Sequence, residues 1–135
     1  PQVLFMGDYD LTAFGPWYGD RDGSIEQTIA SVRRLQQVPA KIWLTSHEDG
    51  CFEGDIAAAC DAYLAVIDER EAKLLDFLGE PRTFDDIVAA CLVYRKPREP
   101  KAFFEWGEGA IMGKHLDRLL GSGAIALEDG RYRRR

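Results

Sequence analysis

The chain has 135 residues, of which 46% are apolar and 30% charged, and its formal net charge is −6. This composition is typical of soluble globular proteins, and no stretch is long and apolar enough for a membrane-spanning helix, so we expect no membrane partner. The three cysteines, Cys51, Cys60 and Cys91, form no CxxC pair. That argues against a disulfide framework and a cysteine-based zinc site, and it favours a cytoplasmic location.

The charge is unevenly spread along the chain. Residues 1–68 hold 4 basic and 11 acidic side chains, whereas residues 69–135 hold 13 and 12. This asymmetry indicates two units with different roles, which we place at 1–68 and 69–135. The chain begins with Pro1 directly before an apolar run, and we interpret it as a piece of a longer protein.

The first unit is predicted to contain a strand, a helix and a second strand. Residues 3–6 are a continuous apolar run, as expected for a strand buried on both faces. A loop rich in Gly, Pro, Asp and aromatic residues covers 11–23, and a helix runs from Ser24 to Pro39. A second apolar run, residues 41–45, predicts the second strand. The apolar face of the helix carries Ile25, Ile29, Val32 and Leu35.

The order strand, helix, strand predicts a right-handed crossover between parallel strands. The carboxyl ends of both strands then lie at one edge of the sheet, where ligands gather in α/β folds. Asp8 follows the first strand and His47 follows the second. We therefore expect these two side chains, 39 positions apart in sequence, to lie close together in space.

The second unit is predicted to contain three helices and a hairpin. A helical pattern runs from Asp55 and either continues past Asp68 or breaks there, with apolar residues as far as Leu78. Thr83 caps a short second helix, and a third covers about 102–120. Gly121 and Gly123 are expected to end the third helix, and Asp129-Gly130 to form the turn of a β-hairpin. The expected core includes Leu74, Leu78, Ile87, Leu116, Leu120 and Ile125.

Four segments together resemble the carboxyl-terminal part of metallo-β-lactamase superfamily hydrolases, in the glyoxalase II-like branch that adds a small winged helix. They are "LFMGD", "WYGDRDGSIEQTIASVRRL", "IWLTSHEDG" and "GKHLDRLLGSGAIALEDGRY". The resemblance covers nearly the whole chain. It implies an α+β fold: the carboxyl-terminal portion of an αββα sandwich over 1–68, followed by a winged helix-turn-helix domain over 69–135.

The resemblance also implies a metal site. Asp8 matches the aspartate that bridges two metal ions, and His47 matches the last histidine ligand. The family usually reads Pro-Gly-His-Gly where this chain has Thr-Ser-His-Glu at 45–48. The family's His-x-His-x-Asp-His motif and its middle histidine are absent from this chain, so further ligands are expected from an amino-terminal half of the hydrolase domain.

Carboxylate and imidazole ligands suit this chemistry for a physical reason. Zn²⁺ held by such groups lowers the pKa of a coordinated water to about 7, which supplies hydroxide at neutral pH. A carboxylate such as that of Asp8 can place one oxygen on each of two cations. Imidazole suits Zn, Fe or Mn, so one or two ions of any of these are compatible with Asp8 and His47.

Several other residues could have either a functional or a purely structural role. Trp17 and Tyr18 either line a substrate cleft or fix the loop to the sheet. Asp10, Asp20 and Asp22 either support the metal ligands or serve only as turn residues. His115 is expected to be a packing or solvent-facing residue rather than a ligand. Cys51 is expected to be buried or idle.

The function predicted for the intact protein is metal-dependent hydrolysis of a small ester, thioester, lactam or phosphodiester. The alternative is a non-enzymatic winged-helix module that binds nucleic acid or a protein partner. Basic residues cluster at 95–98 and 131–135, but the expected recognition helix carries Glu105, Glu108 and Asp117. Base-reading helices need Arg, Lys, Asn or Gln, so we expect no sequence-specific DNA binding. A homo-oligomer remains compatible with the sequence.

Overall fold

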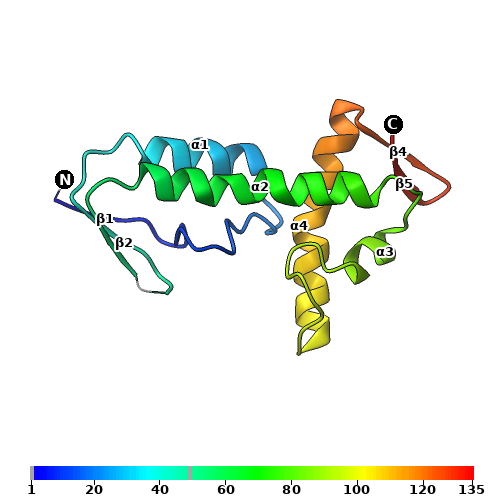
Figure 1. The fold of residues 1–135 in the computed structure, drawn as a ribbon, viewed down its shortest axis with the longest axis horizontal. Coiled ribbons are helices and arrows are strands. Elements are labelled where there is room, and N and C mark those ends of the chain that lie inside the picture. The colour runs from blue at the N-terminus through cyan, green and yellow to red at the C-terminus, as the bar shows by residue number, and fades with distance from the viewer. Residues whose placement is uncertain (1, 49) are drawn as a thin grey trace. The chain divides into compact units, whose positions relative to one another are not determined.

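The computed structural model describes residues 2–48 and 50–135, and Pro1 and Asp49 lie outside the described residues. It divides into two compact units. Unit 1 comprises the described residues of 1–16 and 25–68, and unit 2 comprises 17–24 and 69–135. The loop segment 17–24 thus belongs with the carboxyl-terminal part of the chain. Figure 1 shows the elements in chain order.

Unit 1 contains a three-stranded mixed sheet with the order β1-β2-β3. Strand β1 (Val3–Phe5) pairs in parallel with β2 (Ile42–Leu44), and helix α1 (Ile25–Leu35) connects them. The predicted parallel pairing of two strands joined by a helix is therefore confirmed. Strand β3 (Cys51–Glu53) pairs antiparallel with β2 and was not predicted. Its sequence, Cys-Phe-Glu, does not form the continuous apolar run that predicted β1 and β2.

Helix α1 forms because its apolar residues share one face, and Ile25 and Val32 are buried. Glu26 in its first turn and Arg33 and Arg34 in its last complement the helix dipole. The helix ends at Leu35, short of the expected end at Pro39. The backbone tightens there, since Gln37 N–H donates to the Arg34 carbonyl at 3.1 Å and Val38 N–H to the Leu35 carbonyl at 3.0 Å.

The prediction that the first strand is buried on both faces is wrong. Phe5 is 65% exposed and Val3 is also exposed, whereas Trp43 on the neighbouring strand is only 2% exposed. Side chains alternate between the two faces of a sheet, so one face is covered and the other carries Val3 and Phe5. Cys51, expected to be buried or idle, is a free cysteine with an exposed side chain on β3, so burial does not apply.

Helix α2 (Ala57–Phe77) is continuous through Asp68, which decides between the two readings of that segment. It is followed by α3 (Phe84–Ala89), α4 (Lys101–Ser122), β4 (Ile125–Glu128) and β5 (Arg131–Arg134). Thr83 caps α3 as predicted, and it does so in a capping box. Its hydroxyl accepts from Asp86 N–H at 3.1 Å, and the Asp86 carboxylate accepts from Thr83 N–H at 2.8 Å.

The prediction that Gly123 ends α4 is confirmed, and the same prediction for Gly121 is wrong. Gly123 adopts the left-handed conformation with φ 77°, while Gly121 stays within the helix, because one left-handed residue is enough to end it. Strands β4 and β5 form the predicted hairpin around Asp129 (φ 49°) and Gly130 (φ 72°). Positive φ at both residues matches the type I′ turn that Asp-Gly favours.

The core of unit 2 is close to the prediction. Leu74, Leu78, Ile87, Leu116 and Ile125 are buried. Leu120 is only half-buried, and two other apolar residues of α4, Phe103 and Trp106, are 56% and 57% exposed. In the described ranges, no helix combines the length and apolar character needed to cross a membrane.

Candidate metal site

Asp8 and His47 lie at the same edge of the sheet in unit 1. The parallel ladder continues past both strands, with Met6 N–H donating to the Leu44 carbonyl at 2.7 Å and Ser46 N–H to the Gly7 carbonyl at 3.0 Å. Asp8 and His47 are the residues directly after this last bonded pair. Both are exposed, so both can reach a ligand outside the sheet.

The backbone turns sharply at both positions. Gly7 has φ 61°, which glycine adopts without strain, and Glu48, directly after His47, has φ 58°. The Thr45 hydroxyl donates to the His47 carbonyl at 3.0 Å, which fixes the turn after β2. From α2, the Tyr63 hydroxyl donates to the Asp8 carbonyl at 3.5 Å. The local fold thus holds the backbone of both candidate ligands.

A second carboxylate, that of Asp10, faces His47. Its Oδ2 lies 3.5 Å from His47 Nδ1, and its Oδ1 accepts from the backbone N–H of Thr12 at 3.2 Å and from the Thr12 hydroxyl at 3.0 Å. A carboxylate on one ring nitrogen orients the imidazole and directs the other nitrogen outward. Of the three supporting candidates, the contact selects Asp10, whereas Asp20 instead accepts from Trp17 Nε1 at 3.1 Å.

The donor types fit a metal ion, but their number does not. Within residues 2–48 and 50–135, no group of three or more His, Cys, Asp or Glu side chains is placed to hold an ion. Zinc sites usually take at least three protein ligands. Asp8 and His47 therefore lack, within the described residues, the third ligand that a zinc site needs.

Trp17 and Tyr18, the candidates for a substrate cleft, belong to unit 2 and differ in exposure. Tyr18 is buried, and the Trp17 ring lies 5.5 Å from that of Trp106, at a tilt of 34°. Burial of the Tyr18 side chain leaves its aromatic surface covered within unit 2. A substrate-binding role for these two residues stays a prediction.

Tyr18 belongs to a buried polar network that the sequence did not reveal. Arg70 donates to the Tyr18 hydroxyl at 3.1 Å, and this hydroxyl lies 2.8 Å from His115 Nε2. His115 Nδ1 lies 3.0 Å from Glu71 Oε2, which also accepts from Arg118 at 3.1 Å. A carboxylate only accepts, so His115 Nδ1 carries the proton and Nε2 accepts from Tyr18.

The environment of this network keeps His115 neutral. Burial lowers the pKa of the His115 imidazole, against the opposing effect of the Glu71 carboxylate. Burial likewise raises the pKa of the Tyr18 hydroxyl, although Arg70 opposes this. Since both ring nitrogens of His115 have partners, the expectation that it packs rather than binds metal agrees with its surroundings.

A sequence signal for the network exists in the helical period. Arg70 lies three residues after Ile67 and four before Leu74, so it falls in the middle of a buried helix face. His115 likewise lies four residues after Ile111 and four before Leu119. A charged or polar residue at such a position predicts a paired buried group, because an unpaired one would be costly.

The fold is the mixed α+β arrangement found in part of beta-lactamase-like proteins. A crystal structure of a metallo-beta-lactamase family protein from Thermus thermophilus matches 99% of this chain with a TM-score of 0.68 and 23% identity. A beta-lactamase domain protein from Burkholderia ambifaria matches 98% with a TM-score of 0.66 and 22% identity. The chain spans 42% and 41% of these proteins, about two fifths of each.

Comparisons with family models and with curated proteins give no match. At identities this low, the likeness to the two solved structures shows the fold alone. The predicted resemblance of fold to metallo-beta-lactamase family proteins is confirmed at that level. Metal binding and hydrolysis by this protein stay predictions.

Proposed function

We propose that this chain is the carboxyl-terminal part of a metal-dependent hydrolase of the metallo-β-lactamase superfamily. Asp8 and His47 would be two ligands of a centre with one or two ions of Zn, Fe or Mn, and an amino-terminal half of the domain would supply the others. Such a centre would provide hydroxide for attack on an ester, thioester, lactam or phosphodiester. Fold by itself does not select among these substrates.

One observation carries the proposal: Asp8 and His47 directly follow the hydrogen-bonded pair Gly7 and Ser46 at the carboxyl ends of two parallel strands. Ligands of α/β folds gather at this edge. The contact between Asp10 and His47 adds support, since metal-binding histidines almost always have a partner on the second ring nitrogen.

We propose further that residues 69–135 form a winged-helix domain of the glyoxalase II-like branch. Three helices followed by a hairpin support this, as does the pairing of Arg82 with Tyr132, which adds a third short strand segment to the hairpin. Its role would be structural rather than DNA-reading. Glu108, on the would-be recognition helix, is buried and binds the backbone of residues 93 and 94, so it cannot face a base.

The direct test is metal titration of this chain and of a longer chain that includes the residues encoded upstream. Calorimetry with Zn²⁺ should show weak binding to the 135-residue chain, because two ligands are too few. The longer chain should bind zinc stoichiometrically, as measured by elemental analysis. It should also hydrolyse at least one of p-nitrophenyl acetate, nitrocefin, a thioester or bis(p-nitrophenyl) phosphate.

Asp8→Ala and His47→Ala should each reduce both zinc content and hydrolysis in the longer chain. The control Asp22→Ala, which removes an exposed carboxylate of unit 2, should not. Tight binding to the 135-residue chain that depends on His47 would contradict the partial site. Zinc content that is unchanged by both ligand variants would contradict the proposal as a whole.

A further inference from the structure

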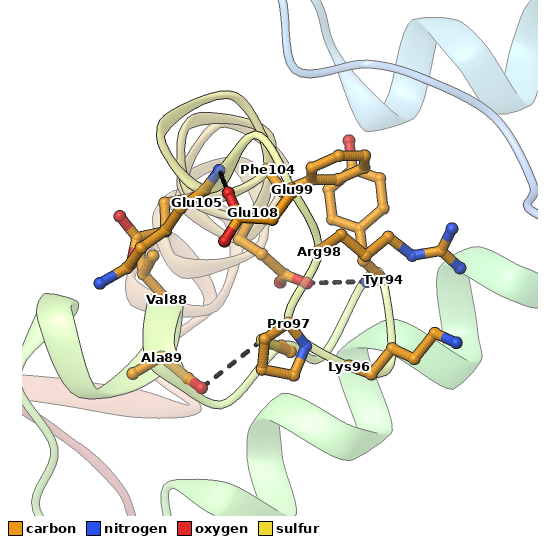
Figure 2. Close-up of a pocket in the computed structure, with 12 residues that line it drawn as sticks. Val88, Ala89, Tyr94, Lys96, Pro97, Arg98, Glu99, Phe104, Glu105 and Glu108 are labelled. Carbon is orange, nitrogen blue, oxygen red and sulfur yellow. Dashed lines mark hydrogen bonds and ion pairs between the residues drawn. The ribbon is translucent and has the colours of Figure 1, made fainter.

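Unit 2 contains a pocket of about 250 Å³ between α3, the loop 90–100 and the first half of α4. Figure 2 shows side chains from all three segments converging on it. Val88 and Ala89 form one wall, and Tyr94 and Phe104 another. The lining is mostly apolar, and the volume suits one or two apolar side chains rather than a large cofactor.

A buried carboxylate holds the pocket open in a fixed shape. Glu108 is 2% exposed, and its oxygens accept from Val93 N–H at 3.0 and 3.1 Å and from Tyr94 N–H at 2.7 Å. Gly107 allows the Tyr94 ring to pack closely, since a Cβ there would clash with the Tyr94 hydroxyl. These contacts anchor the loop on α4, so the pocket is preformed.

The rim of the pocket carries a local excess of positive charge. Lys101 is paired with Glu105 at 3.6 Å. Lys96 and Arg98 line the pocket together with the exposed carboxylate of Glu99, and Arg95 adjoins them in sequence. In the part of the chain that the structure describes, Arg95, Lys96 and Arg98 have no carboxylate within ion-pair distance. Outside the Lys101–Glu105 pair, the exposed charges are therefore three cations and one carboxylate. The chain as a whole is acidic, so this rim is a local exception that complements an anionic partner.

The apolar surface extends beyond the pocket as a row of neighbouring rings. Tyr94 and Phe104 are 4.9 Å apart between centroids, Phe104 and Phe103 5.3 Å, and Phe103 and Trp106 6.2 Å. More than half of the Phe103 and Trp106 surfaces is exposed. An apolar surface longer than its pocket suits an extended chain better than a compact molecule.

We propose that this pocket and its basic rim bind an acidic peptide segment of a partner protein. One or two large apolar side chains of the segment enter the pocket beside Phe104, and flanking Asp or Glu residues contact Lys96 and Arg98. This inference does not depend on the hydrolase proposal, because it uses no residue of the metal edge.

The test uses the 135-residue chain and an array of peptides about 12 residues long, each with a central Leu-Phe pair. One set has Asp and Glu flanks, a matched set has Lys and Arg flanks, and a third set replaces Leu-Phe by Ser-Ser. Fluorescence anisotropy should show the acidic apolar peptides binding at least about tenfold more tightly than either control set.

Substitutions of exposed residues at the pocket test whether the peptide binds there. The double variant Lys96→Glu with Arg98→Glu should weaken binding at least about tenfold, and Ala89→Trp, which fills the pocket mouth, should do the same. The control Arg133→Glu with Arg135→Glu makes the same charge change on the hairpin and tail and should leave affinity within about twofold. Circular dichroism establishes that all variants fold.

Three results would overturn the inference. Equal binding of basic and acidic peptides would remove the charge argument. Unchanged affinity in both pocket variants would place the binding elsewhere. The third result is that acidic peptides fail to bind while another ligand binds the pocket and Ala89→Trp abolishes its binding. That ligand is a second copy of this chain if light scattering shows self-association. It is a nucleic acid if anisotropy shows binding of a single-stranded oligonucleotide.

Discussion

The two histidines of this chain occupy opposite environments. The side chain of His47, at the sheet edge of unit 1, is 57% exposed, whereas that of His115, on α4 of unit 2, is fully buried. Both face a carboxylate through Nδ1: Asp10 at 3.5 Å for His47 and Glu71 at 3.0 Å for His115. The difference lies at Nε2, where His115 bonds to Tyr18.

A carboxylate partner alone therefore does not identify a metal ligand. In His115 the second nitrogen is used within the protein, so the imidazole links two helices and a loop. Among the described residues His47 has no such second partner, and its ring faces solvent at the ends of two parallel strands. A ligand needs an accessible nitrogen, and only the residue at the sheet edge retains one.

The largest expected effect tests the core around His115. Leu116→Ala should lower the free energy of unfolding by about 2–5 kcal/mol, because Leu116 is 2% exposed and its removal leaves a cavity. Urea denaturation followed by circular dichroism measures this. The matched change Leu127→Ala, on the exposed part of the hairpin, should cost under about 0.5 kcal/mol. Equal costs at the two positions would contradict the assigned core.

The histidines themselves give the most direct contrast. His115→Ala should destabilise by about 2–4 kcal/mol, since it leaves a cavity and removes the partner of the Tyr18 hydroxyl. His47→Ala should change stability by less than about 0.5 kcal/mol, because the side chain is exposed. The same denaturation experiment tests both, and a reversed order of the two costs would refute the comparison.

The pH dependence of stability should also distinguish His115 from His47. The folded-state pKa of His115 is lowered by burial, so below about pH 6.5 the unfolded state binds a proton that the folded state does not. Stability should therefore fall as pH decreases from about 6.5, by up to about 1.4 kcal/mol per pH unit. The groups facing His115 are Tyr18, Glu71, Arg70 and Arg118.

Chemical denaturation at several pH values checks this. His115→Gln should lose the contribution that sets in below about pH 6.5, while His47→Gln, which leaves the buried network intact, should retain it. An identical slope in the wild type and in His115→Gln would show that other groups cause the dependence.

The smallest expected effect concerns the proton position on His47. Asp10 faces Nδ1, so the tautomer protonated at Nδ1 should be enriched at about pH 8, and Asp10→Ala should shift the population toward protonation at Nε2. Long-range ¹H–¹⁵N NMR resolves this, since the chain has only two histidines. Asp20→Ala is the matched control. An unchanged His47 spectrum in Asp10→Ala would remove Asp10 as an orienting residue.

Much of the fold was predictable from local patterns. Apolar spacing and end signals such as Thr83, Gly123 and Asp129-Gly130 placed the helices and the hairpin, because capping and turn geometry depend on a few adjacent residues. The parallel pairing of β1 and β2 followed from the order strand, helix, strand, which is typical of a crossover connection. The sequence therefore determined the order of elements and brought Asp8 and His47 to one edge.

Tertiary structure alone decided which polar residues became interior partners. Arg70, Glu108 and His115 are all buried, yet their types occur mostly on surfaces. Helical periodicity locates a residue on a face but does not name the group opposite, which comes from a distant segment: Tyr18 for His115 and the loop at 93–94 for Glu108. Contacts that local sequence does not encode also decided that Phe5 is exposed. They decided likewise that Asp10, rather than Asp20, faces His47.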